Sequence, residues 1–237
     1  MIDTEYSVCN TIIIQHLLDD CKGGSVMNKL IKYNLEIMTG IFAVVLAASL
    51  SQWTELSMLR RMIVVFMVLY TLHEWEESKY PGGFYRIFFS KCTIDPTVSE
   101  ERMHLPVAIY LLMILLIPYA FDSFAVLALV PLVLALFEGF IHTAGIIIHQ
   151  LKKPYSPGMI TAWMMFAYAV YMIGRLNAQL HLGAIDWILG IVLTAVSFFI
   201  METFFMKGVG ITVKEFQTNM RTYMLGRIKK NREEKQQ

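Results

Sequence analysis

The chain has 237 residues, of which 56% are hydrophobic and 16% charged, and its mean hydropathy is +0.53. Soluble globular domains are about 45–50% apolar and about 25% charged, so this composition argues against a soluble enzyme or a disordered chain. The 20 Lys and Arg nearly balance 19 Asp and Glu, and the net charge of +1 gives no basic field for a nucleic-acid partner. Three cysteines, none in a Cys-x-x-Cys pair, exclude a disulfide scaffold and a thiolate zinc site. The composition indicates a polytopic membrane protein.

The first 26 residues differ from the rest of the chain. Met27 opens a sequence typical of a signal-anchor start, Met-Asn-Lys-Leu-Ile-Lys-Tyr. Just upstream, Lys22-Gly23-Gly24 can be encoded as AAAGGAGGN, a bacterial ribosome-binding sequence at a workable distance from an ATG. We therefore expect translation to start at Met27, so that residues 1–26 would be an untranslated extension. A genuine but disordered tail is the alternative.

The apolar runs predict an all-α bundle of about six transmembrane helices within residues 27–206. A bilayer core about 30 Å thick needs roughly 20 helical residues. Three long uncharged runs meet this need, and three shorter runs end at an ionisable position and continue in helix-compatible sequence. The helices are expected at residues 35–51, 58–79, 104–121, 124–150, 158–175 and 185–206.

The basic residues predict the orientation of the bundle. Of the 20 Lys and Arg, all but Arg60, Arg61 and Arg175 fall in the termini or in the connections after the second and fourth helices. Basic residues are retained on the cytoplasmic side, so both termini should face the cytoplasm of a bacterial inner membrane. Residues 207–237 form a basic cytoplasmic tail, suited either to an amphipathic helix on the membrane surface or to a solvated segment.

Ionisable residues recur inside three of the expected spans. They are His73, Glu76 and Glu77 in the second helix, Glu138, His142 and His149 in the fourth, and Glu202 in the sixth. A charge inside a span costs about 2.5–3.5 kcal/mol on insertion scales, so such residues face the bundle interior or a wet cavity. At 1.5 Å per residue, all but His149 lie roughly 20–29 Å from the outer end of their helices. We expect one pocket between these three helices in the cytoplasmic half of the bilayer, with His149 and Glu202 at its edge or entrance.

The fifth helix is expected to begin at Tyr155-Ser156-Pro157-Gly158. Pro157 suits the first turn of a helix, and Ser156 suits the N-cap. The free N–H groups of this helix end would lie beside the carboxylates or bind an anionic headgroup. The alternative is a capped re-entry turn without a binding role.

Three short motifs thus follow one another at the edges of the expected spans. They are His73-x-x-Glu76-Glu77, the x-x-x-His spacing from Glu138 to His142, and Tyr155-x-Pro157-Gly158. In this order they resemble the HXXEE family of predicted integral membrane proteins of bacteria and archaea, over roughly residues 40–205. The family's second motif is Asn-x-x-x-His, so Glu138 stands where the family has Asn. The resemblance implies a membrane protein suspected of enzymatic activity and specifies no reaction.

The same side chains predict a metal site. His73, Glu77, Glu138 and His142 would supply two imidazoles and two carboxylates, a set that suits zinc, iron or manganese. Bundle metal sites are built from Glu and His one turn apart on facing helices. Glu76 would then act as general base on a bound water. We expect metal-dependent hydrolysis or group transfer on a lipid-like or amphiphilic substrate that enters from the membrane lipid.

Three alternatives stay open. Adjacent carboxylates in an apolar site cannot all be ionised, and a protonated one beside His73 would suit metal-free acid–base chemistry, such as isomerisation of a lipid or isoprenoid. The cluster could be a proton relay in a transporter, although inverted repeats and broken helices are not visible. It could also only hold the bundle together, but two imidazoles are too few to neutralise its carboxylates.

Overall fold

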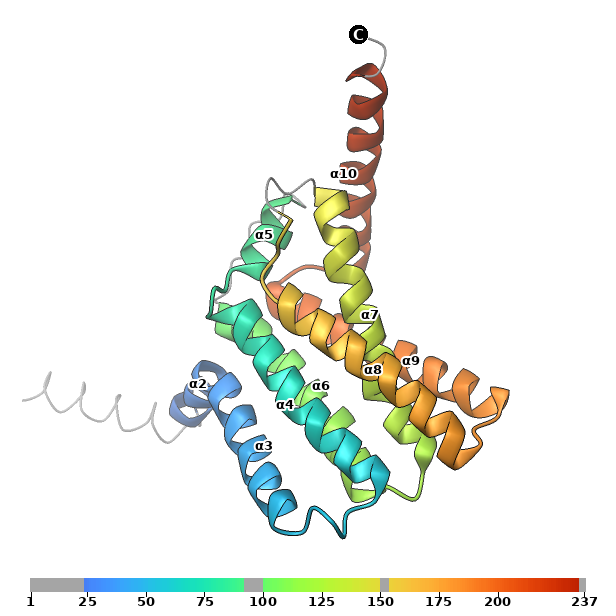
Figure 1. Ribbon diagram of the computed structural model, residues 1–237. Helices are drawn as coiled ribbons and strands as arrows, with labels where there is room; N and C mark the ends of the chain where they lie inside the picture. The colour runs from blue at the N-terminus through green and yellow to red at the C-terminus, as the bar shows by residue number, and fades with distance from the viewer. Residues whose placement is uncertain (1–23, 92–99, 150–153, 235–237) are drawn as a thin grey trace, which may run out of the picture.

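The computed structural model describes residues 24–91, 100–149 and 154–234 (Figure 1). Within these ranges the chain is helical without any strand, which confirms the all-α prediction. The helices are α2 Gly24–Lys32, α3 Asn34–Ser51, α4 Met58–Ser78, α5 Phe84–Lys91, α6 Glu100–Ala120, α7 Ala125–His149, α8 Met159–Leu180, α9 Ala184–Val209 and α10 Val213–Glu234. Residues 1–23 lie outside the described part, so the expected start at Met27 is untested.

Among the described residues, α3, α6, α7, α8 and α9 are long and apolar enough to cross a membrane. These five helices indicate an integral membrane protein. The remaining expected span, 58–79, forms as the helix α4 within one residue of its predicted end. Helix α4 is long enough to cross a membrane but is less apolar than these five helices, because Arg60 and Arg61 lie at one end and three glutamates at the other.

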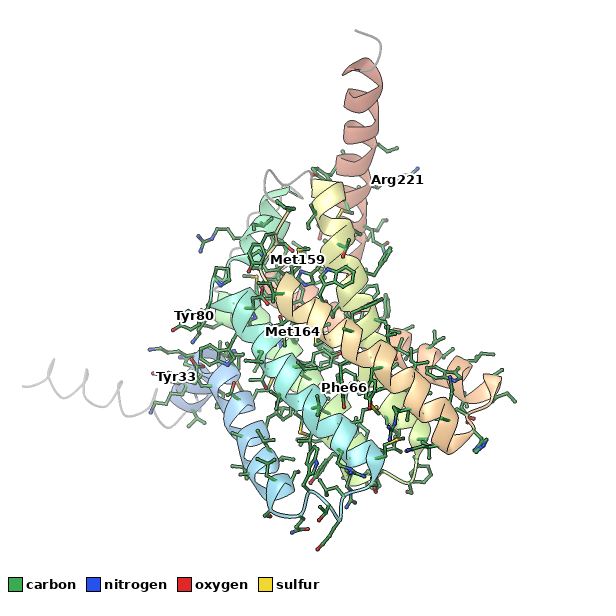
Figure 2. All side chains as sticks on the ribbon, viewed as in Figure 1. Tyr33, Phe66, Tyr80, Met159, Met164 and Arg221 are labelled. Carbon is green, nitrogen blue, oxygen red and sulfur yellow. The ribbon has the colours of Figure 1, made fainter. Side chains whose placement is uncertain are left out.

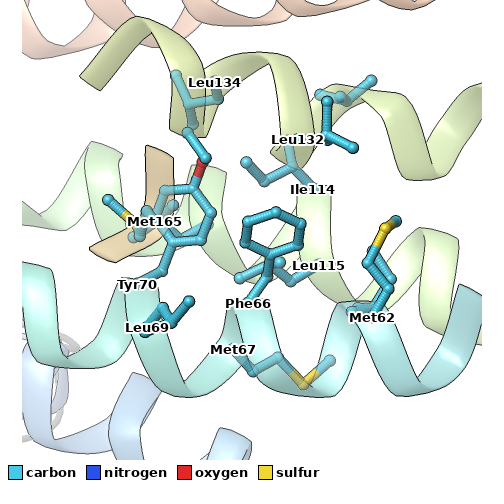
Figure 3. Close-up of a cluster of buried hydrophobic side chains, with 14 of the residues drawn as sticks. Met62, Phe66, Met67, Leu69, Tyr70, Ile114, Leu115, Leu132, Leu134 and Met165 are labelled. Atoms are coloured by element: carbon cyan, nitrogen blue, oxygen red, sulfur yellow. The ribbon is translucent and has the colours of Figure 1, made fainter. Parts of the chain in front are cut away.

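Helix α4 occupies the middle of the bundle and packs against α3, α6, α7 and α8. Figure 3 shows its side chains Phe66 and Tyr70 among those of neighbouring helices, including Leu115 of α6 and Leu132 of α7. Lipid chains are as apolar as these side chains, so burying the side chains between helices gives no hydrophobic gain over exposing them to lipid. Packing contacts and interhelical hydrogen bonds therefore hold the bundle together. One such bond runs from the Tyr70 hydroxyl to the backbone oxygen of Pro131, at 2.7 Å.

Polar contacts fix α4 at its N-terminal end. Ser57 is its N-cap, and the Ser57 hydroxyl accepts a hydrogen bond from the backbone N–H of Arg60 at 3.2 Å. The same hydroxyl donates to Asp122, between α6 and α7, at 2.6 Å, and the guanidinium of Arg60 lies 3.2 Å from the Asp122 carboxylate. These contacts set the level of α4 against α6 and α7, and therefore the level of the ionisable residues at its other end.

After α4 the chain reverses and enters the short helix α5. Gly82 has a φ of +73°, and a Cβ there would lie 2.8 Å from the backbone oxygen of Ser78, so the turn requires glycine. Tyr85 and Phe89 of α5 are buried against Met103 and Phe205. This packing brings the beginning of α5 to the C-terminal end of α4, where the ionisable residues lie.

The tail expected from residue 207 is mostly the helix α10. It extends beyond the other helices in Figure 1, and Figure 2 labels Arg221 near its middle. Its first turns pack on the bundle through Val213, Phe216 and Met220.

Candidate metal centre

His73 of α4 is held by the first turn of α8. Its Nδ1 lies 3.0 Å from the backbone oxygen of Gly158 and 3.0 Å from Oγ1 of Thr161. A carbonyl oxygen only accepts hydrogen bonds, so this contact places the ring proton on Nδ1. The lone pair of Nε2 is then free on the other side of the ring. Metal-binding imidazoles are commonly fixed in this way, by a hydrogen bond from the nitrogen that does not bind the metal.

His142 of α7 lies across from His73, with 5.1 Å between the ring centroids and an interplanar angle of 82°. Its Nδ1 is 3.1 Å from Oγ of Ser156, and the ring of Phe84 packs against it at 5.0 Å between centroids. Its Nε2 is 2.9 Å from Oε1 of Glu77, but the contact lacks the geometry of a hydrogen bond. Among the described residues, this buried nitrogen therefore has no hydrogen-bond partner.

Two carboxylates approach the same two nitrogens. Oε1 of Glu77 lies 3.6 Å from Nε2 of His73 and 2.9 Å from Nε2 of His142. Oε2 of Glu138 lies 3.8 Å and 3.9 Å from the same atoms. The Glu77 side chain is 6% exposed and that of Glu138 is 20% exposed, so Glu138 lies at the more open side.

His73, Glu77 and His142 form a buried group whose ligand atoms all lie within 4.8 Å of one another. This group could hold a metal ion. Its donor set is two imidazole nitrogens and one carboxylate oxygen, which suits a divalent transition metal. The lack of a hydrogen bond at Nε2 of His142 supports this reading, because a buried polar atom without a hydrogen bond costs free energy unless a ligand satisfies it.

Glu76 has a different environment, against the N-terminus of α8. Its Oε1 accepts hydrogen bonds from the Tyr155 hydroxyl at 2.9 Å and from the backbone N–H of Ile160 at 3.2 Å. Its Oε2 accepts from the backbone N–H and the hydroxyl of Thr161, at 2.9 Å and 2.6 Å. The carboxylate thus satisfies free N–H groups of the first turn and complements the helix dipole. Glu76 caps α8 from another helix and fixes the turn that holds His73.

The beginning of α8 differs from the sequence prediction. The N-cap is Gly158, with φ 87° and ψ −13°, and Ser156 faces His142 instead of capping the helix. Pro157 precedes the helix rather than lying in its first turn. A Cβ on Gly158 would lie 2.6 Å from Cγ of Glu77 and 2.7 Å from Cε1 of His142. The last motif residue must therefore be glycine, both for its positive φ and for its closeness to the two side chains.

The sequence predicted that the last span, now α9, would form the third side of the pocket. In the structure the beginning of α8 takes this place, next to α4 and α7. The half-buried Glu202 of α9 has no hydrogen bond or ion pair with the cluster among the contacts of the described residues. The side chain of His149, at the end of α7, lies outside the described part. Periodicity places residues on one face of a helix, but it does not say which neighbour that face meets.

Glu74 and His104 form a second buried pair, which sequence reasoning did not find. Oε2 of Glu74 lies 4.0 Å from Nδ1 of His104, and Oγ of Ser78 lies 3.2 Å from the same nitrogen. The ring of Tyr85 packs on that of His104, at 4.6 Å between centroids. The pair connects α4 with α6, on a different side of α4 from the His73 group. Glu74 directly follows His73 in the sequence, so the two side chains point to different sides of α4. The sequence does not tell which helix lies on the Glu74 side, and so it did not identify His104 as the partner.

The fold and the cluster together define a helical membrane protein with a buried histidine–glutamate centre. The family model described as "Protein of unknown function with HXXEE motif" matches residues 64–172, a range that includes His73, Glu77 and His142. This match over residues 64–172 confirms the resemblance to the HXXEE family that the motifs predicted. No curated protein and no solved structure matches the chain.

Proposed function

We propose that the protein is a membrane-embedded, metal-dependent hydrolase or transferase that acts on a lipid-like or amphiphilic substrate. The observation that carries this proposal is the convergence of His73, Glu77 and His142, with the buried Nε2 of His142 2.9 Å from a Glu77 oxygen but without a hydrogen bond. The apolar spans around the centre favour a substrate that enters from the lipid. The many basic residues after α9 support a centre in the cytoplasmic half of the bilayer.

The distances favour three protein ligands and an open position. In a tetrahedral site with bonds of about 2.0–2.1 Å, two ligand atoms lie about 3.3 Å apart. Oε1 of Glu77 lies 3.6 Å from Nε2 of His73 and 2.9 Å from Nε2 of His142, one distance slightly above this separation and one slightly below it. Glu138 is further from both nitrogens, at 3.8 Å and 3.9 Å, and more exposed. Catalytic zinc sites typically have three protein ligands and leave the fourth position to water or substrate.

Glu138 then has a role beside the open position. A carboxylate and the family's Asn both accept hydrogen bonds, and Asn is a poor metal ligand, so orientation of the attacking water or hydroxyl fits either residue. In this chain the Glu138 carboxylate also accepts the proton of the nucleophile and returns it to the leaving group. Glu76 was the base expected from the sequence, but all its hydrogen bonds go to Tyr155 and α8. It is a positioning residue in this mechanism.

The other residues prepare the centre for this reaction. A divalent ion bound there would supply a Lewis acid for a carbonyl or phosphoryl oxygen of the substrate. Gly158 and Thr161 hold the proton of His73 on Nδ1, and Ser156 orients His142 through its own Nδ1. Phe84 covers the His142 ring and excludes water from that side.

The experiment that tests the proposal is a metal analysis of the purified protein. The full chain is purified in detergent after expression with zinc, iron and manganese, and bound metal is measured for wild type, His73→Ala and His142→Ala. We expect about one ion per chain in the wild type and none in either variant. His181→Ala is the matched control, since His181 is exposed at the far end of α8. Folded wild-type protein without metal would overturn the proposal.

One distance favours a second candidate, metal-free acid–base catalysis. Nε2 of His142 and Oε1 of Glu77 are 2.9 Å apart, so a small rotation of either side chain would allow a proton to pass between them. Such a pair suits isomerisation of a lipid or isoprenoid. The same metal analysis separates the two candidates, because only the metal-dependent one requires a bound ion.

A further inference from the structure

A groove of about 590 Å³ lies between α6 and α9, apart from the histidine–glutamate centre. Its lining on α6 extends from Leu105 to Pro118, and its lining on α9 from Leu193 to Phe204. Val130 of α7 contributes to its inner wall. At 1.5 Å per residue, the lined part of α6 is about 20 Å long. This length exceeds one leaflet of a hydrocarbon core that is about 30 Å thick, so a whole lipid chain fits along it.

The lining suits a hydrocarbon and not a polar ligand. Its hydroxyl groups belong to Tyr110 and Ser197, whose oxygens lie 3.3 Å apart. Oγ of Ser197 also donates to the backbone oxygen of Thr194 at 3.1 Å, so the Tyr110 hydroxyl can donate to Ser197 and each proton has an acceptor within the protein. A polar ligand in this groove would lose its hydration without gaining new partners, whereas a hydrocarbon would lose nothing.

The groove is open to the surroundings of the helices. Ile114 and Val130 are buried at its base, whereas Met113 of α6 and Leu193 of α9 are exposed at its rim. Both α6 and α9 are long and apolar enough to cross a membrane. The medium at this rim is therefore lipid, and a lipid chain can enter from the side.

A series of ring contacts leads from Phe205, the residue after a groove residue, to the histidine–glutamate centre. Phe204 lines the groove, and its neighbour Phe205 packs on Tyr85, at 5.4 Å between centroids. Tyr85 packs on Phe84 at 5.6 Å, and Phe84 packs on His142 at 5.0 Å. The groove thus ends beside the aromatic residues that cover the centre. A molecule with its chain in the groove would have its polar end on the side of His142.

From these observations we infer that the groove holds the hydrocarbon chain of a single membrane amphiphile, whose polar end is directed toward His142; as a substrate site this rests on the proposed function. The occupant is a lipid chain because the groove is long, apolar and open to lipid. A second copy of the chain is the other occupant that an apolar groove could take, and the experiment below distinguishes it.

Photo-crosslinking in a bilayer tests the inference. The full chain is reconstituted in vesicles of phosphatidylethanolamine and phosphatidylglycerol that contain a phosphatidylglycerol with a diazirine in the middle of one acyl chain. After illumination, labelled residues are mapped by mass spectrometry. We expect labelling several-fold higher at Met113 and Leu193 than at Val196 and Phe199, which are exposed on α9 outside the groove. Equal labelling of all exposed apolar residues would overturn the inference, and so would protection of Met113 and Leu193 from the lipid probe, which is the result expected if a second copy of the chain fills the groove.

A matched pair of variants makes the test specific. Ser197→Phe fills the groove from its wall, whereas Val196→Phe places the same ring on a neighbouring residue that is 53% exposed. We expect Ser197→Phe to lower the labelling of Met113 several-fold and Val196→Phe to leave it unchanged. Leu193→Trp, at the exposed rim, provides the same comparison if Ser197→Phe does not fold. Unchanged labelling of Met113 in a folded Ser197→Phe or Leu193→Trp protein contradicts the inference.

Failure of this inference and failure of the proposed function give different results. If the protein binds about one metal ion but labels evenly over its apolar surface, the groove is not a chain site and the metal centre stands. If labelling concentrates in the groove of a protein that binds no metal, the chain site stands and the metal-dependent function fails. His142→Ala should lose the metal and keep the groove labelling, because His142 does not line the groove.

Discussion

Nδ1 of His73 lies 3.0 Å from the backbone oxygen of Gly158, so the first turn of one helix sets the tautomer of an imidazole on another. Glu76, three residues after His73, holds that same turn by three hydrogen bonds from Ile160 and Thr161, and it accepts a fourth from the Tyr155 hydroxyl just before the helix. His73 and Glu76 of the HXXEE motif thus both bind the N-terminal end of α8 from α4. The HXXEE motif and the Tyr-x-Pro-Gly motif form one structural unit, with Glu77 directed to the opposite partner, His142.

Gly158→Ala tests how tightly this unit is packed. An alanine at φ +87° is strained by about 1–2 kcal/mol, and its Cβ would overlap Glu77 and His142. We expect a lower midpoint of thermal unfolding in detergent and a loss of bound metal. Gly174→Ala is the control within the same helix, because a Cβ there meets no atom within 4 Å. It should be neutral or stabilising by up to about 1 kcal/mol. Equal effects of the two substitutions would contradict the packing described for Gly158.

Removal of the Glu76 carboxylate should destabilise the start of α8. In Glu76→Ala, the backbone N–H groups of Ile160 and Thr161 lose their acceptor, and the buried N–H of Thr161 costs about 1–3 kcal/mol when left unpaired. Hydrogen exchange at the beginning of α8 should rise, while α9 should be unchanged. Glu55→Ala, at an exposed position before α4, is the control and should change neither. Unaltered exchange in α8 would rule out the capping role.

The two carboxylates at the centre should differ in their effect on metal binding. Glu77→Gln removes a ligand and should abolish stoichiometric binding. Glu138→Gln should lower the affinity by no more than about 10–100-fold, the usual effect of a residue that acts on a ligand or on bound water. Competition titration with a chromophoric chelator measures both. If Glu138→Gln loses the metal as completely as Glu77→Gln, then Glu138 is a fourth ligand and the position assigned to substrate is closed.

Tyr155 gives a prediction for alkaline pH. Burial and its hydrogen bond to Glu76 raise the pKa of Tyr155 to about 12, above the value of about 10 expected in the unfolded chain. The phenol therefore stabilises the folded protein fully below pH 10, and this contribution is lost as the pH rises through 12. We expect the unfolding midpoint of the wild type to fall between about pH 10 and 12 more steeply than that of Tyr155→Phe. Parallel pH profiles would show that Tyr155 does not donate to Glu76.

Much of the fold could be predicted, because an apolar run long enough to cross a membrane must satisfy its backbone hydrogen bonds internally and therefore forms a helix. All six expected helices form, and α4 ends within one residue of its predicted end. The largest error is the end of α8, at Leu180 instead of residue 175. Arg175 was taken as the limit of an apolar run, but the residue is exposed and compatible with helix, so the charge does not end it. Hydropathy locates the apolar part of a helix and not its last turn.

The site was predictable only in part. Spacing along α4 and α7 identified the residues that meet, since His73 and Glu77 are one turn apart, as are Glu138 and His142. It did not separate the roles of Glu76 and Glu77, which are adjacent but face different helices. The difference depends on where α8 begins, and that depends on Gly158, whose positive φ and close contacts appear only in three dimensions.

The most direct test of the metal centre is X-ray absorption spectroscopy of the zinc-loaded protein. The account predicts one zinc shell of nitrogen and oxygen atoms at about 2.0–2.2 Å, without sulfur, and with the outer-ring scattering of two imidazoles. In His142→Ala the scattering of one imidazole should disappear, or the metal itself should be lost. A folded wild-type protein that binds no zinc, or a spectrum without imidazole scattering, would contradict the account.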